Sequence, residues 1–312
     1  MKALILGLGN QGEKRKKILL KNNNFYSSVD PFNERADYKN INNIMKDKYD
    51  TVFICTPDFL KEKYIKYFLK KKKNIFVEKP LRLSLNKILE IKKISDKNNC
   101  TVHIGYNHRF EPHFQTLKKL IKKKIVGKIL YLNIFYGNGT SKLISKSWRK
   151  NKLSIYDDIG SHIIDLIYQW FSFNKITRLE VIKNSLENKF IDHINIFFAL
   201  DDNIRINIEI SYCSWKNKFN LSLIGKKGEI RISNLCKWGP SNLEIHKRVL
   251  PSGAPIIKTK IIKKKDPTWQ KEFNFFRKVV KNRRGSFDHL REIKINEFLD
   301  QIKLNIKNKI KC

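Results

Sequence analysis

Short apolar runs alternate with amphipathic stretches over the first hundred residues of the chain. The apolar runs are nearly continuous, which is typical of strands buried on both faces of a parallel sheet. The expected strands are Ala3–Leu6, Phe25–Val29, Asp50–Cys55, Asn74–Val77 and Thr101–Ile104, and the expected helices are Lys14–Leu20, Phe59–Leu69 and Leu83–Asp96. Strand–helix alternation of this kind predicts an N-terminal α/β domain with a parallel sheet covered by helices.

The pattern changes after about residue 115, where longer strands follow one another with few helices between them. Isoleucines at positions 204, 206, 208 and 210 alternate with polar residues, so one face of that strand is expected to be buried. The expected strands are Ile129–Tyr136, Ile176–Lys183, His193–Leu200, Ile204–Tyr212, Phe219–Ile224 and Glu229–Ile232, and the expected helices are Asp158–Phe171, Thr268–Lys281 and His289–Ile306. We predict a first domain at residues 1–115 and, at 116–312, an α/β domain with a large, open, mostly antiparallel sheet formed as a meander.

Composition supports a folded chain and argues against nucleic acid as a partner. Of the 312 residues 41% are hydrophobic, enough for a large core, and 65 Lys+Arg minus 29 Asp+Glu gives a net charge of +36. A strongly basic chain raises nucleic acid or an anionic membrane as partners. Here the lysines are scattered through every expected element, and no aromatic–basic stacking motif or helix-turn-helix signature accompanies them. We therefore expect a solvated basic surface.

Cysteine usage and hydropathy indicate a reduced, cytoplasmic protein. The five cysteines are an odd number without a C-x-x-C pair, a pattern typical of intracellular chains. No stretch approaches the ~18 uninterrupted apolar residues of a membrane span. The N-terminus reads as a strand and not as a signal peptide, so no membrane partner is expected. His108, His113 and His162 show no metal-ligand spacing, so no metal is expected.

A glycine-rich turn follows the first expected strand and opens the first expected helix. Its sequence, Gly7-Leu8-Gly9-Asn10-Gln11-Gly12, has the G-x-G-x-x-G spacing of dinucleotide-binding turns. Gly7 would permit the tight turn, Gly9 the approach of a pyrophosphate, and Gly12 close packing of helix on strand. The helix N-terminus would offer free N–H groups to the phosphates. This predicts a Rossmann domain.

An acidic residue stands where such a domain holds the ribose of its cofactor. Asp30 ends the second expected strand, 18 residues beyond Gly12. Its carboxylate can accept both ribose hydroxyls and would repel a 2′-phosphate. Pro31 and Phe32 follow, with no arginine directly after the acid. NAD is therefore predicted over NADP.

Two further segments carry chemistry. Lys79, in Glu78-Lys79-Pro80, follows an expected strand at the sheet edge where open α/β sheets bind ligands, and could donate to a substrate oxygen. Asp158 and His162 lie four residues apart and share a face if a helix starts there. His162 suits proton transfer near neutral pH. The alternative makes Asp158 or Ser161 a helix N-cap and His162 a packed core histidine.

Taken in order along the chain, these motifs resemble the Gfo/Idh/MocA family of NAD(P)-dependent oxidoreductases. The residues that carry the resemblance are Gly7–Gly12, Asp30, Asn33–Ala36, Cys55-Thr56-Pro57, Glu78-Lys79-Pro80, Gly105–Phe110, Trp148-Arg149 and Asp158-x-Gly160-Ser161-His162-x-x-Asp165. The family fold, a Rossmann domain followed by an α/β domain with an open, mostly antiparallel sheet, agrees with the pattern above.

The resemblance implies an NAD(P)-dependent dehydrogenase acting on a sugar, polyol or nucleotide sugar. It gives Lys79 contact with substrate and nicotinamide, His162 the role of acid/base and Asp158 that of its assistant. Arg109 is expected near the substrate. By the same resemblance, the residues around the cofactor are Gly7, Gly9, Asn10, Gln11, Gly12, Asp30, Thr56, Pro57, Glu78, Asn107, Trp148 and Arg149. The family also implies pairing of two copies through the C-terminal sheet.

The sequence departs from the family at several positions. Lys61 stands where a histidine is common after the Thr-Pro pair, and Lys152-Leu153-Ser154 replaces a glycine-rich stretch before the Asp-x-Gly motif. Residues 248–255 and 266–269 look like members of the family associated with surface-polysaccharide sugars, which favours a nucleotide-sugar substrate. The alternative function is a non-catalytic protein that uses this fold to sense a dinucleotide or to bind a partner.

Overall fold

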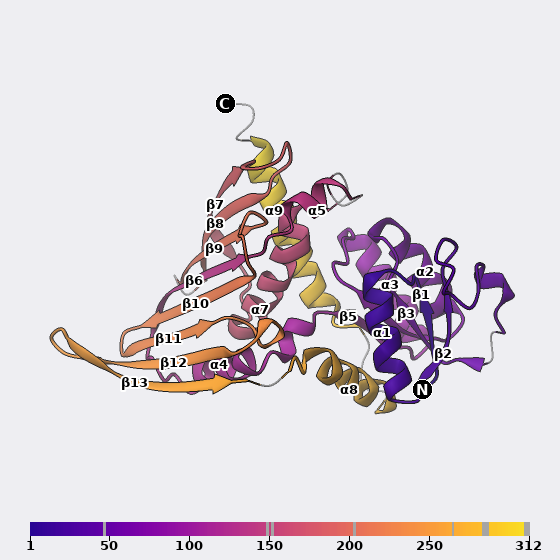
Figure 1. Cartoon of the computed structure of the whole chain (residues 1–312), viewed down its shortest axis with the longest axis horizontal. Helices are drawn as coiled ribbons and strands as arrows, with labels where there is room; N and C mark the ends of the chain where they lie inside the picture. Colours follow the sequence, from indigo (N-terminus) through magenta and orange to yellow (C-terminus); the bar gives the residue numbers. More distant parts are fainter. Residues whose placement is uncertain are drawn as a thin grey trace. The chain divides into compact units, whose positions relative to one another are not determined.

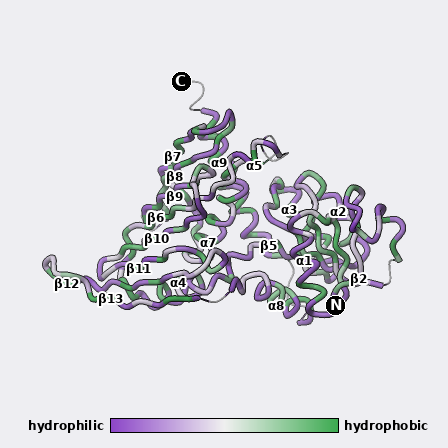
Figure 2. The backbone as a smooth tube through the Cα atoms, viewed as in Figure 1, coloured by the Kyte–Doolittle hydropathy of each residue, from purple (hydrophilic) through white to green (hydrophobic). Residues whose placement is uncertain are grey.

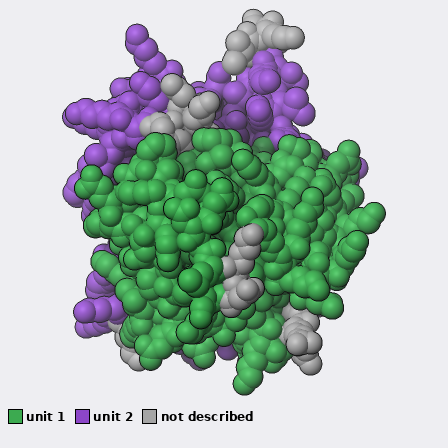
Figure 3. Space-filling model, turned by 90° about the vertical axis from the view of Figure 1, so that its right-hand side faces the viewer, with its two compact units in different colours: residues 1–107, 269–296 green, residues 108–268, 297–312 purple. Residues whose placement is uncertain are grey.

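The fold is described from a computed structural model of the chain, in which residues 1–45, 48–147, 150, 153–201, 204–263, 265–282 and 287–308 are described. The chain forms two compact units. Unit 1 comprises residues 1–107 and 269–296, and unit 2 comprises 108–268 and 297–312 (Figure 3). The expected domain boundary between residues 115 and 116 stays a prediction. In the structure, residues 269–296, which lie near the end of the chain, belong to unit 1.

Unit 1 is built on a five-stranded parallel sheet of order β2-β1-β3-β4-β5 (Figure 1). Its strands are β1 (Ala3–Leu6), β2 (Phe25–Val29), β3 (Thr51–Ile54), β4 (Asn74–Glu78) and β5 (Val102–Gly105), and its helices are α1 (Asn10–Lys21), η1 (Ile41–Asn43), α2 (Asp58–Lys70), α3 (Leu85–Lys97) and α8 (Thr268–Lys281). β1, β3 and the apolar positions of β4 are buried, as expected for strands covered on both faces. The predicted parallel α/β sheet is confirmed.

Unit 2 is built on an eight-stranded sheet of order β13-β12-β11-β10-β6-β9-β8-β7. Its strands are β6 (Ile129–Gly137), β7 (Ile176–Asn184), β8 (His193–Leu200), β9 (Arg205–Ser211), β10 (Lys218–Gly225), β11 (Gly228–Ser233), β12 (Ser241–Val249) and β13 (Gly253–Ile262). The sheet is mostly antiparallel, as predicted. The simple meander was wrong in one respect, because β6 inserts between β9 and β10 and runs parallel to β9.

Helices cover one face of the large sheet (Figure 1). They are α4 (Pro112–Lys122), α7 (Ser161–Phe171) and the C-terminal part of α9 (His289–Asn308), while the short elements are η3 (Asn107–Phe110), α5 (Ser141–Ser145), η4 (Tyr156–Gly160) and η5 (Cys236–Trp238). Ile206, Ile208 and Ile210 are buried beneath the helices, which confirms the period of two predicted for β9. Hydrophilic and hydrophobic segments interleave throughout both units (Figure 2). None of the helices in the described ranges is long and apolar enough to cross a membrane.

Candidate functional site

The glycine turn of unit 1 has the geometry that its sequence predicts. Gly7 follows β1 with a φ of +90°, which side-chain-bearing residues rarely adopt. A Cβ on Gly12, in the first turn of α1, would lie 2.1 Å from the carbonyl oxygen of Gly7. Gly9 is different: its backbone is extended, and an added Cβ would meet no atom within 4 Å. The open side of Gly9 is the approach that a pyrophosphate needs.

Asp30 is tied directly to this turn. Its Oδ2 accepts a hydrogen bond from the backbone N–H of Leu8 at 2.7 Å, and its Oδ1 accepts from those of Phe32 and Asn33. Partial burial of Asp30 opposes ionisation, but these three hydrogen bonds outweigh it and lower the pKa of the carboxyl. Asp30 is thus held ionised beside the glycine turn, in the form that accepts ribose hydroxyls.

These residues fit a dinucleotide cofactor. Asn10, Gln11 and Gly12 form the first turn of α1, whose N–H groups point out of the helix. Thr56 and Pro57 join β3 to α2, and the Thr56 hydroxyl is buried with no hydrogen-bond partner in the described part of the chain. A buried hydroxyl without a partner is costly, and a bound ligand would satisfy it. The open side of Gly9 and the Thr56 hydroxyl are therefore the observations that favour a bound dinucleotide.

Two buried cations hold the Glu78-Lys79-Pro80 corner at the end of β4. Arg15, on α1, pairs with Glu78 at 2.6 Å and with Glu272 of α8 at 2.8 Å. Lys61, on α2, donates hydrogen bonds to Asp58 at 2.5 Å and to the carbonyl oxygen of Pro80 at 2.7 Å. The Lys79–Pro80 peptide bond is cis. The backbone that carries Lys79 is thereby fixed on both sides of the lysine.

In unit 2, His162 lies in the first turn of α7 and Asp158 lies in the turn before it. The predicted helix start at Asp158 was wrong: residues 156–160 form one wide π-turn, η4, and α7 begins at Ser161. π-Turns within helices are frequent at functional sites. The Asp158 carboxylate accepts a hydrogen bond from the Tyr212 hydroxyl at 3.0 Å. His162 is only 8% exposed.

His162 is stacked on a second histidine, His108 of η3, with ring centroids 4.0 Å apart. The Nε2 of His108 lies 3.5 Å from the Tyr136 hydroxyl of β6 and 3.4 Å from the Nζ of Lys237 in η5. Lys237 also donates a hydrogen bond to that hydroxyl at 2.8 Å. Sequence reasoning gave no functional role to His108, Tyr136 or Lys237. They come from three distant segments, so no spacing pattern joins them.

The remaining predicted site residues have different surroundings. Arg109, expected near the substrate, makes a two-pronged ion pair with Asp165 of α7 at 2.6 and 2.8 Å. Asn107 begins η3 and is buried. Trp148 and Arg149 lie outside the described residues. Among the described residues no group of His, Cys, Asp and Glu side chains could hold a metal ion.

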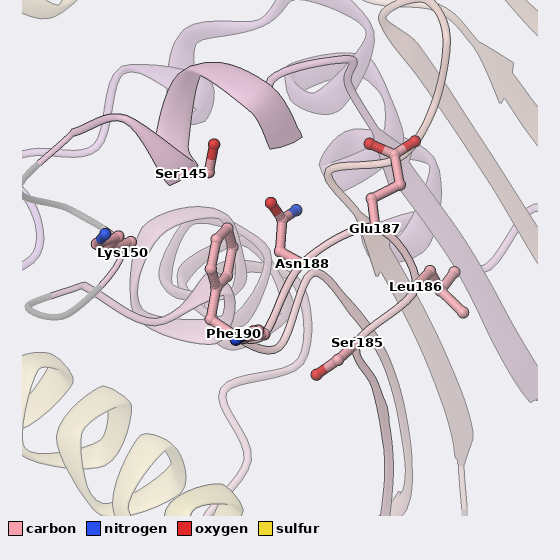
Figure 4. Close-up of a pocket in the computed structure, with 8 residues that line it drawn as sticks. Ser145, Lys150, Ser185, Leu186, Glu187, Asn188 and Phe190 are labelled. Carbon is pink, nitrogen blue, oxygen red and sulfur yellow. The ribbon is translucent and has the colours of Figure 1, made fainter.

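Unit 2 also has an open pocket of about 550 Å³ on its surface. Figure 4 shows Phe190 and Asn188 of the β7–β8 connection near the middle of the view, with Lys150 on one side and Ser145 above them. That connection is ordered by Asp192, which accepts hydrogen bonds from the backbone N–H groups of Leu186, Glu187 and Asn188. Of the predicted site residues that the structure describes, none lines this pocket.

Comparison of the sequence with models of known protein families shows to which family the chain belongs. A family model for an oxidoreductase family with an NAD-binding Rossmann fold matches residues 5–106, and a model for the Gfo/Idh/MocA C-terminal domain matches residues 114–231. The chain belongs to the Gfo/Idh/MocA family. Members of this family share the Rossmann domain and the open sheet described above, which confirms the predicted combination of domains.

Relatives in this family include dehydrogenases of sugars. The chain is 23% identical to glucose-6-phosphate 3-dehydrogenase of Bacillus subtilis over 210 residues, which cover 62% of this chain and 60% of the relative. The alignment thus spans less than two thirds of that relative's length. Among solved structures, levoglucosan dehydrogenase in complex with NADH has a TM-score of 0.84 at 15% identity, covering 99% of this chain and 97% of the other. UDP-N-acetylglucosamine 3-dehydrogenase from Acidithiobacillus ferrooxidans has a TM-score of 0.81 at 14% identity, covering 98% and 97%.

Proposed function

We propose that the protein is an NAD-dependent dehydrogenase that transfers a hydride between a hydroxyl-bearing carbon of a sugar, polyol or nucleotide sugar and the nicotinamide. The observation that carries the proposal is the retention, in one Gfo/Idh/MocA chain, of an open dinucleotide turn with Asp30 together with Lys79, Asp158 and His162. A protein that only senses a dinucleotide needs the turn but not all three of the other residues.

The chain's own residues would divide the chemistry as follows. NAD, when bound, supplies the nicotinamide carbon that accepts the hydride. A ring nitrogen of His162 takes the proton of the reacting hydroxyl. The Nζ of Lys79 donates a hydrogen bond to the same oxygen as negative charge develops on it. Asp158, held by Tyr212, orients the His162 ring.

We propose NAD rather than NADP because the Asp30 carboxylate is ionised and lies beside the turn. Three backbone N–H groups keep it charged, and a 2′-phosphate would meet that charge at close range. Oδ1 accepts two of these N–H groups and Oδ2 accepts one, so Oδ2 keeps an acceptor site for a ribose hydroxyl. The NADH complex of levoglucosan dehydrogenase is consistent with this choice.

For the substrate we propose a phosphorylated or nucleotide-linked sugar. Glucose 6-phosphate and UDP-N-acetylglucosamine, which are named in two of the relatives, are both anionic sugars. The net charge of +36 would attract such ligands to the protein. A homo-oligomer formed through the open face of the large sheet, where Tyr131, Ile182 and Phe197 are exposed, stays a prediction, as does a cytoplasmic location.

Thermal unfolding with and without dinucleotide tests the first half of this proposal. NAD at about 100 times its dissociation constant stabilises a binding protein by roughly 2.7 kcal/mol. A shift of the midpoint with NAD and little with NADP is expected. NADH formation from NAD with a panel of sugars, sugar phosphates and nucleotide sugars tests the second half. NAD binding with no turnover on that panel would favour the sensing function.

A further inference from the structure

Lys237 is a partly buried cation that lies outside the motifs predicted from sequence. It lies in η5, between β11 and β12, with its Nζ 4.5 Å from the ring centroid of Trp238 and 5.5 Å from that of Tyr136. Burial opposes its charge and lowers its pKa to about 8, against the raising effect of the carboxylates Asp266 and Glu111. At neutral pH the side chain is therefore still mostly an ammonium group.

The hydrogen bonds of this ammonium fix the state of His108. The Lys237 ammonium group can donate hydrogen bonds but cannot accept them. Its Nζ lies 2.8 Å from the Tyr136 hydroxyl and 3.4 Å from His108 Nε2. A proton on His108 Nε2 would point a second donor at the same cation. The contact with Lys237 therefore favours Nε2 as an acceptor, which corresponds to the neutral ring with its proton on Nδ1.

The state of His108 matters because His162 is stacked on it, at 4.0 Å between centroids. Among the other charged groups of these elements, Asp165 is paired with Arg109, and the Asp158 carboxylate accepts a hydrogen bond from the Tyr212 hydroxyl. On the far side of Lys237, the groups that raise its pKa are Asp266, Glu111 and Cys236, and the Cys236 thiol donates a hydrogen bond to Glu111. The ammonium of Lys237 is the cation that opposes a second positive charge on the stacked rings.

We propose that Lys237 is a positioning residue that, through Tyr136 and His108, holds the His162 ring oriented and uncharged, in the form that can accept a proton from a substrate. The benefit for turnover rests on the proposed function. The effect on the two histidines does not, because it is a property of unit 2 without substrate. The assignment adds Lys237, Tyr136 and His108 to the surroundings of His162, which the sequence predicts to be catalytic together with Lys79 and Asp158.

The test is an NMR titration of the histidine Cε1–H resonances of the full chain between about pH 5 and 9. The chain has seven histidines, and His108→Gln and His162→Gln identify the two resonances by their loss. Lys237→Met removes the charge but keeps an apolar stem, and should raise the titration midpoint of His108 or His162 by about one pH unit. Lys237→Arg, which keeps a cation, and Lys258→Met, on the exposed strand β13, should leave both midpoints within a few tenths of a unit.

Unchanged midpoints in a folded Lys237→Met protein would overturn the proposal. If that variant fails to fold, the wild-type protein decides: a midpoint of His108 at or above about 6.5, the ordinary value, would overturn it as well. Once the panel yields a substrate, the acidic limb of the kcat/KM profile should move to higher pH in Lys237→Met but not in Lys237→Arg. Shifted midpoints without any turnover would leave this proposal standing and refute the proposed function.

Discussion

The two units assemble their chemistry in opposite ways. In unit 1 the candidate residues stand at the ends of parallel strands, in short contiguous segments such as Gly7–Gly12 and Glu78–Pro80. In unit 2 they meet from four separate elements, with His108, Tyr136, His162 and Lys237 lying on η3, β6, α7 and η5. A parallel sheet brings its strand ends to one edge, so local motifs suffice there, whereas a mixed sheet brings together residues far apart in sequence.

The units also differ in how they surround a cation that is removed from solvent, fully for Arg15 and partly for Lys237. Arg15 is enclosed by two carboxylates, Glu78 and Glu272, whose charges outweigh the cost of burial, so that the pKa of Arg15 is raised. Lys237 makes its hydrogen bonds to a hydroxyl and an imidazole, and its pKa is lowered. We expect the first arrangement to stabilise the fold and the second to lower its stability, a cost found at many functional sites.

The largest expected effect is the loss of turnover when unit 2 loses His162 or unit 1 loses Lys79. His162→Gln should lower kcat by about 10²- to 10⁴-fold, because general acid–base catalysis contributes that much. Lys79→Met should have an effect of similar size, and the double variant should lose little more than the worse single variant if both groups act on one oxygen. Steady-state kinetics on the substrate found in the panel measures all three. Independent, multiplying losses would separate the two groups, and near-wild-type kcat in both single variants would refute the site.

Next in size is the destabilisation expected when unit 1 loses its buried cation. Arg15→Met leaves Glu78 and Glu272 buried without their partner, which should lower the free energy of unfolding by about 3–5 kcal/mol. Arg35→Met is the matched control, since Arg35 is 75% exposed in its pair with Glu13 and should cost at most about 1 kcal/mol. Urea unfolding of both variants gives the comparison. Equal losses would mean that burial does not distinguish the two ion pairs.

The same contrast explains what could be predicted from sequence. The five strands of the smaller sheet were placed to within a residue at each end, because a strand buried on both faces is a continuous apolar run. Asp30 and the glycine turn were found because their spacing is set by one βαβ unit. Strand β13 was missed, since it is exposed almost throughout and has no buried alternation. Lys237 could not be singled out among 65 Lys and Arg residues, because its partners depend on the fold of unit 2.

A third prediction separates the binding role of a glycine from its folding role. Gly9→Ala adds a methyl group to open space on an extended backbone, so the free energy of unfolding should change by less than about 1 kcal/mol. NAD affinity should fall by at least about tenfold, because the methyl group occupies the path of the pyrophosphate. Gly12→Ala should act mainly on folding. It should lower the free energy of unfolding by about 1–3 kcal/mol, since the new Cβ would meet the Gly7 carbonyl. Calorimetric titration with NAD and thermal unfolding distinguish the two. Unchanged NAD affinity in Gly9→Ala would contradict the proposed binding of the pyrophosphate at the glycine turn.

The smallest expected effect is a gain in stability: removing the partly buried Lys237 ammonium of unit 2 should stabilise the protein. The pKa of Lys237 is about 8, below the ~10.4 of an unfolded chain, so the unfolded state binds more protons between these values. The cost of the charge is therefore present in full below pH 8 and fades as the pH rises toward 10.4. Lys237→Met should gain on the order of 1–2 kcal/mol at pH 7, after the lost hydrogen bond to Tyr136 is subtracted.

That gain should shrink as the pH approaches 10, because the wild-type side chain then loses its proton as well. Thermal unfolding of both proteins at neutral and alkaline pH measures the difference, with Lys258→Met of the exposed strand β13 as a control that should show neither effect. A Lys237→Met protein that is less stable than wild type at pH 7 would mean that the ammonium supports the fold, as Arg15 does in unit 1. Arg15 and Lys237 would then both support the fold, and the two units would not differ in this respect. A stabilised variant with altered histidine titration would instead assign Lys237 a purpose other than stability.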